Sequence, residues 1–431
     1  MSVGRVAGRA LGVLRGEWAV FRRLPRQTRV LLAVSTLFVF ASPVPALFIS
    51  AFIMRNSQSV VHVMAFQLAS FTAVPGAFYL NGLLMRRFRP STLYGAGLVL
   101  IGVSLFVMTS LAELTLAGLV VIGFVTGVAI GFQWANRNLL TLTHTTDENR
   151  NYYFGVESFF NCVSGVLIPL AAGFFITWLG NGNSGGLEAG TRAAYRIVAG
   201  WVVAMALLTS ALLWRGRFGR AEGRVGVAVR FDRVWCGMLA LAALKGIVQV
   251  FQFALPAMLV MRLLGGRESA LGLIQGTGAL AAAVLMYVIG RMSGARHRLG
   301  LMAAALALYT AGAAAHAVWF SPVSVLFFMG CLLLSQPVSE WALGPIQMQV
   351  VDRAVRRRQG DGYAHLCGYE VGLYAGRLAG GGLFVWVAEA VSGDFALRYV
   401  LVMLASVQLL SLPLAREILA SMRREVTDAG G

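Results

Sequence analysis

Long apolar runs separated by short basic gaps dominate the chain. A bilayer core of about 30 Å requires about 20 apolar residues in a helix, and a window of that length finds twelve runs. They lie near 30–54, 59–85, 92–110, 115–142, 152–178, 193–214, 234–262, 269–290, 299–319, 322–350, 363–391 and 395–414. Backbone groups in hydrocarbon must be hydrogen-bonded within their own segment. The pattern therefore predicts an all-α polytopic membrane protein with twelve transmembrane helices.

The arginines in the gaps predict the orientation. If the N-terminus is cytoplasmic, the inside segments hold 27 of the 36 basic residues and the outside loops hold six. Because cytoplasmic loops carry an excess of Lys and Arg, we expect both termini to be cytoplasmic in a bacterial inner membrane.

The longest basic gap, 215–233, divides the runs into six and six. We expect it to be a cytoplasmic linker between an N-terminal six-helix half, 30–214, and a C-terminal six-helix half, 234–414. Residues 1–29 hold seven arginines and one glutamate, which favours a basic amphipathic segment on the anionic cytoplasmic leaflet. Residues 415–431 are predicted to form a cytoplasmic tail.

The two halves resemble each other at equivalent places. The fourth run ends in "QWA", Gln133–Ala135, and the tenth carries "EWA", Glu340–Ala342, near its end. The next runs open with "YYFGVESFF" and "HLCGYEVGL", which aligns Glu157 with Glu370. A parallel repeat predicts two pseudo-symmetric bundles around an axis along the membrane normal, with a cavity between them.

Six plus six spans, a basic central loop and cytoplasmic termini resemble the major facilitator superfamily. The family's loop between spans two and three reads as a glycine, an Asp-Arg pair, a second glycine and further basic residues. The loop "GLLMRRFRPS" keeps Gly82 and Arg87, with Arg86 in place of the acid and Arg89 in place of the second glycine. The resemblance implies that spans one, four, seven and ten line a transport path, supported by two, five, eight and eleven.

A second motif in span five is also partial. "GVLIPLAAG" resembles the Pro-Gly pattern of the family's antiporters, with Ile168 in place of the glycine before Pro169.

Six charged residues lie in the interiors of the predicted spans, at least five residues from either end, where each costs roughly 2.5 to 3.5 kcal/mol unless it has a partner or water. All six lie on spans that the resemblance assigns to the cavity: Arg137, Glu157, Lys245, Glu340, Glu370 and Arg377.

Arg137 and Glu157 are predicted to pair at the cytoplasmic ends of two successive spans, since residue counts place them at the same depth. Two interpretations are open, a structural clamp between adjacent helices and a gate latch that breaks when the inner mouth opens. Gly123, Gly127 and Gly131 in the same run predict close helix packing.

Lys245 and Arg377 lie near mid-depth, which suits an anionic group on a substrate. The alternative is an internal network in which Glu340 and Glu370 neutralise them. A carboxyl in a poorly hydrated site can load and release a proton near neutral pH. Glu370 is therefore the preferred proton carrier, with its repeat equivalent Glu157 as a second candidate and Glu340 as a third.

Polar and aromatic residues of the same spans are candidates for the pocket. Gln249 either binds substrate or joins helices as an amide. Trp134 and Trp341, which are related by the repeat, either stack on a substrate or anchor the chain at the interface.

We expect no metal site and no cofactor. The four cysteines, Cys162, Cys236, Cys331 and Cys367, lie in apolar runs without ligand spacing. Nor does the chain show a phosphate loop or a nucleophile–base pattern, so an enzyme is not expected. The net charge of +18 sits in the gaps rather than on one face of a folded domain, which argues against nucleic acid.

The sequence therefore predicts a monomeric secondary active transporter in membrane lipid. It would move a small polar solute, anionic or zwitterionic, by alternating access with proton coupling. One alternative is an exporter or flippase of an amphiphile such as a drug or lipid-linked sugar. Another is a non-transporting membrane assembly factor.

Overall fold

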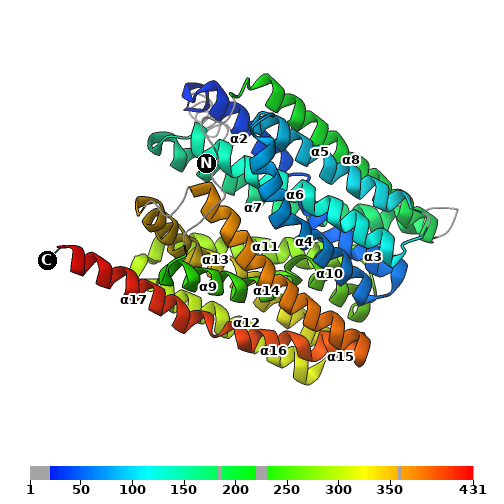
Figure 1. Ribbon diagram of the computed structural model, residues 1–431. Helices are drawn as coiled ribbons and strands as arrows, with labels where there is room; N and C mark the ends of the chain where they lie inside the picture. Colours follow the sequence, from blue (N-terminus) through cyan, green and yellow to red (C-terminus); the bar gives the residue numbers. More distant parts are fainter. Residues whose placement is uncertain (1–19, 112, 183–186, 220–230, 358–361, 431) are drawn as a thin grey trace, which may run out of the picture.

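The computed structural model of the protein describes residues 20–111, 113–182, 187–219, 231–357 and 362–430. Regular structure in these ranges is helical (Figure 1), which confirms the all-α prediction. The first group comprises α2 (Arg26–Phe38), the π-helical turn η1 (Val44–Phe48), α3 (Ile49–Ser57), α4 (Val60–Leu84), α5 (Pro90–Ser110), α6 (Leu116–His144), α7 (Asp147–Gly182) and α8 (Leu187–Arg215).

The second group follows the 215–233 gap. It comprises α9 (Arg233–Gln249), α10 (Phe251–Leu263), α11 (Glu268–Met292), the 3-10 turn η2 (Ala295–His297), α12 (Arg298–Trp319), α13 (Pro322–Arg356), α14 (Gly362–Ala390), α15 (Gly393–Phe395), the π-helical turn η3 (Ala396–Val400), α16 (Leu401–Gln408) and α17 (Ser411–Gly430). Figure 1 shows the first group in the upper part of the molecule and the second in the lower part.

Eleven helices within the described residues are long and apolar enough to cross a membrane. They correspond to eleven of the twelve predicted runs. The remaining run, 30–54, is divided into α2, η1 and α3. Pro43 and Pro45 interrupt it, because proline has no backbone N–H and its ring clashes with the preceding turn.

The glycines of α6 pack closely against α4, as the four-residue spacing predicted. A Cβ atom at Gly123 would lie 2.6 Å from the carbonyl oxygen of Phe66, and one at Gly127 or Gly131 would meet Ser70 or Ala77. Small residues let two helix backbones approach, so these glycines serve the contact between α4 and α6.

The main contacts between the two groups of helices are α7 with α11, α4 with α14, and α3 with α10. The first is the closest, because a Cβ atom at Gly173 of α7 would lie 2.5 Å from the carbonyl oxygen of Glu268 in α11. It involves the C-terminal part of α7 and the N-terminal part of α11.

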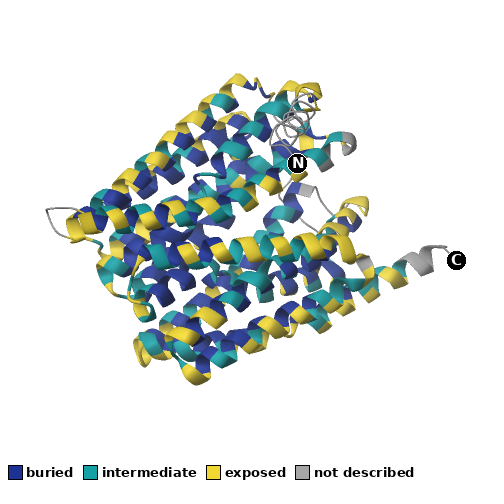
Figure 2. Ribbon diagram, turned by 180° about the vertical axis from the view of Figure 1, so that it is seen from behind, coloured by how far each residue is buried: buried dark blue, intermediate teal, exposed yellow. Residues whose placement is uncertain are grey.

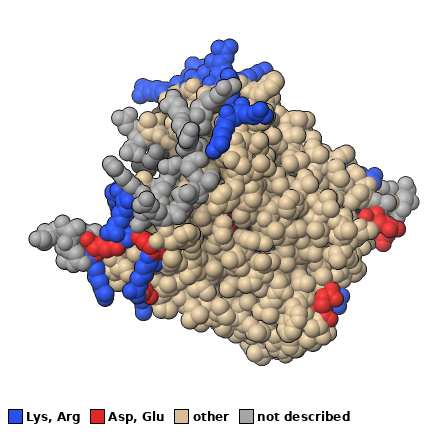
Figure 3. Space-filling view, viewed as in Figure 1, with Lys and Arg blue, Asp and Glu red and all other residues tan. Residues whose placement is uncertain are grey.

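The surface is apolar around the middle of the molecule. Figure 2 shows buried residues on the inner faces of the helices and exposed ones on the outer faces, where Trp178, Trp201 and Trp386 are exposed. Figure 3 shows charged side chains gathered towards two ends, with a wide uncharged belt between them. An apolar surface of this extent suits contact with lipid tails.

Candidate functional site

The Arg137–Glu157 pair lies between α6 and α7. Nη2 of Arg137 is 2.6 Å from Oε1 of Glu157, whose side chain is 6% exposed. The guanidinium also lies 5.1 Å from the centre of the Trp134 ring, a cation–π distance. Both helices belong to the first group, so this pair holds neighbouring helices together and does not bridge the two groups.

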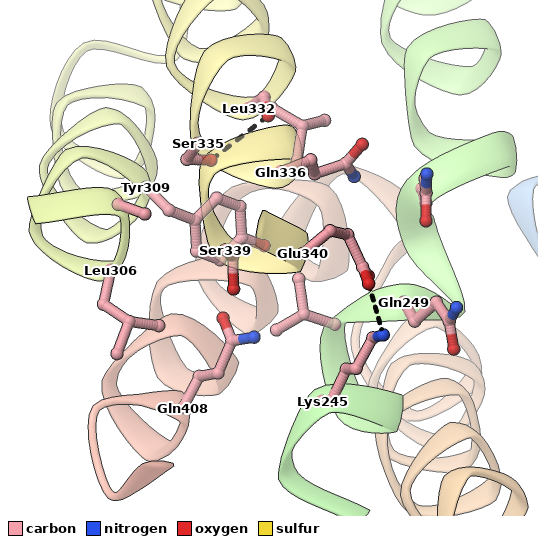
Figure 4. Close-up of a pocket in the computed structure, with 13 residues that line it drawn as sticks. Lys245, Gln249, Leu306, Tyr309, Leu332, Ser335, Gln336, Ser339, Glu340 and Gln408 are labelled. Carbon is pink, nitrogen blue, oxygen red and sulfur yellow. Dashed lines mark hydrogen bonds and ion pairs between the residues drawn. The ribbon is translucent and has the colours of Figure 1, made fainter. Parts of the chain in front are cut away.

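Lys245 of α9 pairs with Glu340 of α13. Nζ of Lys245 is 2.7 Å from Oε2 of Glu340 (Figure 4). The lysine side chain is 15% exposed and the glutamate side chain 54%. Lys245 is thus the less exposed partner, and the Glu340 carboxylate is accessible from the space beside α13.

Arg377 of α14 is the most enclosed of the three cations, with a side chain that is 7% exposed. It is held from three sides. Nη1 lies 3.3 Å from Oε2 of Glu370, and Nε and Nη2 donate to Oε1 of Gln249 at 3.1 and 2.8 Å. Its guanidinium lies 4.4 Å from the ring centre of Phe71, a residue of α4 in the first group. Arg377 therefore sits where the two groups meet.

The two pairs of the second group form one set, the central charge set: Lys245, Glu340, Gln249, Arg377 and Glu370. Lys245 and Gln249 are four residues apart on α9 and so lie on the same face. Gln249 links the two pairs, because its Oε1 also accepts from Nη2 of Arg377 at 2.8 Å. Two cations and two carboxylates give this set a net charge of zero.

A cavity of about 50 Å³ adjoins the central charge set. Thirteen residues of α9, α10, α12, α13 and α16 line it: Lys245, Val248, Gln249, Gln252, Ala305, Leu306, Tyr309, Leu332, Ser335, Gln336, Ser339, Glu340 and Gln408. Figure 4 shows Lys245 and Glu340 facing each other at one side of it. All these residues belong to the second group of helices.

The predicted site residues divide into two places. Lys245, Glu340, Gln249, Arg377 and Glu370 come together, whereas Arg137, Glu157 and Trp134 form a separate cluster. Within the described residues, no hydrogen bond or ion pair joins the two places.

Trp341 was given two interpretations, stacking on a substrate and anchoring at the membrane interface. It packs against an apolar cluster that contains Ile289 of α11, Ala305 of α12 and Val338 of α13. Its repeat equivalent Trp134 is 46% exposed and lies beside Arg137. Equivalent positions in the repeat thus have different neighbours.

An ion pair that was not predicted joins the two groups of helices. We call it the outer latch, because the predicted topology places it on the outer side; it consists of Arg55, Glu268, Tyr195 and Gly266. Arg55 of α3 contacts Glu268 of α11 twice, from Nε to Oε1 at 2.6 Å and from Nη2 to Oε2 at 2.8 Å. Glu268 is 2% exposed and also accepts from the Tyr195 hydroxyl at 3.2 Å. A bidentate Arg–carboxylate contact is among the strong ones, so the latch fastens this end of the molecule.

The backbone before α11 is shaped for the outer latch. Gly265 and Gly266 have φ of 76° and 66°, in the left-handed region that glycine adopts at no steric cost. Nη2 of Arg55 donates to the carbonyl oxygen of Gly266 at 2.6 Å. The sequence holds the Gly-Gly pair Gly265–Gly266, followed by the acid Glu268 at the start of a span. Charged residues were considered only in the interiors of the predicted spans, so this acid was not a candidate.

The outer latch leads to a prediction. Glu268→Gln removes the counter-ion of Arg55, so the contact between α7 and α11 should open more often. Thr177 of α7 lies at this contact, where its hydroxyl accepts a hydrogen bond from the Ser269 backbone N–H of α11. In the Glu268→Gln background, a Thr177→Cys thiol should therefore react about ten times faster with a membrane-impermeant maleimide. This factor follows because hydrogen bonds to charged groups contribute about 1.5–3 kcal/mol.

The matched control is Arg262→Gln, because Arg262 and Asp394 form an ion pair whose side chains are 44% and 47% exposed. Exposed pairs contribute little, so this variant should leave the labelling rate unchanged. Equal rates in the Glu268→Gln and Arg262→Gln backgrounds would show that the latch does not hold the two groups together.

Comparison with known families decides the class of protein. The model of the Major Facilitator Superfamily matches residues 30–366, more than three quarters of the chain. The chain belongs to the major facilitator superfamily. Members of this family are transporters rather than enzymes, and the apolar helices agree with a multi-pass membrane protein.

Two curated relatives each match about a third of the chain. "Uncharacterized protein YqgE" of Bacillus subtilis (strain 168) is 26% identical over 155 residues, which is 36% of this chain and 36% of that protein. "Uncharacterized protein in sodM 3'region" of Geobacillus stearothermophilus is 23% identical over 167 residues, 37% of this chain and 78% of that protein. The chain thus matches about a third of the length of the first relative, and the nature of the substrate has to be argued from the site itself.

Proposed function

We propose that this superfamily member is a secondary active transporter of a small polar solute with an anionic or zwitterionic group. The observation that carries the proposal is the central charge set, two enclosed cations and two carboxylates beside a cavity. Burying ion pairs costs desolvation free energy that well-packed apolar residues would avoid. Charges kept at such a cost, one of them where α14 meets α4 of the other half, are suited to exchange partners with a solute.

The balance of the central charge set favours a zwitterion over a simple anion. An anion alone would replace one carboxylate and leave that carboxylate without its cation. A zwitterion can place its anionic group on Lys245 or Arg377 and its cationic group on Glu340 or Glu370, so each buried charge keeps an opposite partner. Glu340 is the accessible carboxylate, because its side chain is 54% exposed.

The proposed topology has twelve spans in two six-helix halves, with α2, η1 and α3 together forming the first span. The excess of basic residues in the inside segments supports cytoplasmic termini and a cytoplasmic 215–233 segment. The amphipathic segment 1–29 lies mostly outside the described residues.

Alternating access requires that contacts between the halves break on one side while the other side closes. The outer latch joins the halves between α3 and α11. A second link lies towards the other end of α4, where the Tyr363 hydroxyl of α14 donates to the Phe78 carbonyl oxygen at 2.8 Å. We propose that rocking of the halves exchanges the outer latch for contacts on the opposite side.

Proton coupling is assigned to Glu370. Its contact with Arg377 is 3.3 Å, longer than the 2.6 Å of the Arg137–Glu157 pair, and its side chain is 20% exposed. When Arg377 turns to a substrate anion, Glu370 loses its cation, and an unpaired carboxyl in a poorly hydrated site takes up a proton. Glu157 keeps its arginine throughout this exchange.

A thermal-shift screen of the purified protein against small anions, zwitterions, cations, neutral sugars and amphiphiles tests the proposal. A ligand that binds the folded state raises the unfolding temperature. We expect the largest rise with zwitterions or anions, and its loss in Lys245→Gln but not in the surface control Arg262→Gln. Stabilisation by amphiphiles alone would favour the exporter, and stabilisation by none of these classes would favour an assembly factor.

A further inference from the structure

The cavity beside the central charge set is an amide- and hydroxyl-rich chamber inside the second group of helices. Nine of its thirteen lining residues are polar or charged: Lys245, Gln249, Gln252, Tyr309, Ser335, Gln336, Ser339, Glu340 and Gln408. Four of them are glutamines. The apolar remainder, Val248, Ala305, Leu306 and Leu332, lies among them. So many polar side chains at a helix contact are costly unless a ligand or water satisfies them.

Tyr309 shows that the chamber has an unmet hydrogen-bonding group. Its side chain reaches from α12 toward α13 (Figure 4) and is 3% exposed. The hydroxyl is buried and makes no hydrogen bond within the described residues. A buried polar atom without a partner costs free energy, and a turn of the Tyr309 side chain toward the chamber would let a ligand there match the hydroxyl.

Four other polar side chains at the chamber are also uncommitted. The described residues offer no hydrogen bond to the side chains of Gln252, Gln336, Ser339 and Gln408, whereas Ser335 donates to the Leu332 carbonyl oxygen at 3.1 Å. Amides and hydroxyls both donate and accept. They suit a group that does the same, such as an alcohol or an amide.

The chamber selects against a charged occupant. Its one cation and one carboxylate, Lys245 and Glu340, already neutralise each other at 2.7 Å. A further ion would enter without a surplus opposite charge, and its desolvation would not be offset. The volume of about 50 Å³ corresponds to about four waters at 10–15 Å³ each, enough for an arm of a few heavy atoms.

We propose that this chamber is a specificity subsite for an uncharged hydroxyl- or amide-bearing arm of the substrate, with Tyr309 as the residue that recognises it. The inference rests on the proposed function, since the charged part of the same molecule would lie at Arg377 and Glu370, which do not line the chamber. It narrows the substrate class to solutes that carry a small neutral hydrogen-bonding group next to the charged one.

A cysteine at Ser339 tests the chamber without knowledge of the substrate. Purified Ser339→Cys protein is treated with methanethiosulfonates that differ in one group: ethyl, 2-hydroxyethyl, 2-sulfonatoethyl and 2-(trimethylammonium)ethyl. The thiolate attacks the reagent sulfur, a mixed disulfide forms and methanesulfinate leaves. Peptide mass spectrometry separates this site from the native cysteines. Each rate is divided by that of the Ser110→Cys variant, whose position at the end of α5 is exposed.

We expect the hydroxyethyl reagent to react about five times faster than the ethyl reagent at this site, the effect of one neutral hydrogen bond, and faster than both charged reagents. Adding Tyr309→Phe should remove that advantage and leave the ethyl rate unchanged. Equal normalised rates, a preference for a charged reagent, or no modification by any of the four would overturn the proposal.

Tyr309→Phe alone gives an independent measurement. Because the hydroxyl lacks a partner in the protein, its removal should leave the unfolding temperature equal or higher. A clear fall would mean that the hydroxyl is bonded within the fold and is not kept for a ligand. Both measurements are independent of Arg377 and of transport, so failure of the proposed function would leave them as predicted, and failure of the subsite would leave anion binding intact.

Discussion

Arg137→Gln or Glu157→Gln alone should destabilise the protein by about 3 kcal/mol, because each leaves a buried charge without its partner. The two atoms of the pair lie 2.6 Å apart and the Glu157 side chain is 6% exposed, so water compensates the loss poorly. The unfolding temperature of purified protein in detergent measures the effect.

The double variant Arg137→Gln/Glu157→Gln should be less destabilised than the sum of the single ones, since neither charge then remains. The positive control is the exchange Arg137→Glu/Glu157→Arg, which keeps an ion pair between α6 and α7. Strict additivity of the two single effects would show that the residues do not interact.

The same variants separate the structural clamp from the gate latch. If the pair is only a clamp, the charge-exchanged protein recovers both its stability and its transport rate. If the pair must open during the cycle, a variant with restored stability still transports at an altered rate. Arg137 also lies over the Trp134 ring, so Trp134→Leu tests whether this ring holds the arginine once Glu157 releases it.

Much of the fold could be predicted from the sequence because each span carries its own signal. An apolar run of sufficient length has to be helical in a bilayer, and eleven runs are such helices. The first run deviates where Pro43 and Pro45 remove backbone donors. That break was readable from a Pro-x-Pro pair inside an apolar run.

The charged residues were harder to place, since depth follows from residue counts and lateral contacts do not. Arg137 and Glu157 were expected to pair because residue counts place them at the same depth on successive spans, and they do. Arg55 and Glu268 lie on helices far apart in the chain, and no residue count brings them together. Trp341 and Trp134 have different neighbours, because the rotation of a helix is set by its neighbours rather than by the repeat.

Lys245→Gln and Arg377→Gln should each reduce binding of the anionic or zwitterionic ligand at least about tenfold, the factor that follows from about 1.4 kcal/mol. Truncating one partner of an enclosed charge pair commonly costs more than that. Arg377→Gln should have the larger effect, because its side chain is the less exposed and it also holds Gln249. Titration by thermal shift measures both variants, with Arg262→Gln as the surface control.

An unchanged affinity in the double variant Lys245→Gln/Arg377→Gln would make the two cations structural. So would a preferred ligand that is uncharged or cationic, because neither cation would then have a group to bind. The unfolding temperature of the ligand-free variants is measured alongside, so that loss of folding is not mistaken for loss of affinity.

Proton-coupled exchange at the central charge set is tested by comparing two activities of Glu370→Gln in proteoliposomes with an imposed pH gradient. The solute is the compound that most raises the unfolding temperature of the unsubstituted protein. Glutamine keeps the shape of the side chain and cannot exchange a proton. The predicted result is solute exchange close to that of the unsubstituted protein together with loss of uphill accumulation. Accumulation that still follows the pH gradient in Glu370→Gln would contradict the assignment of proton coupling to this residue.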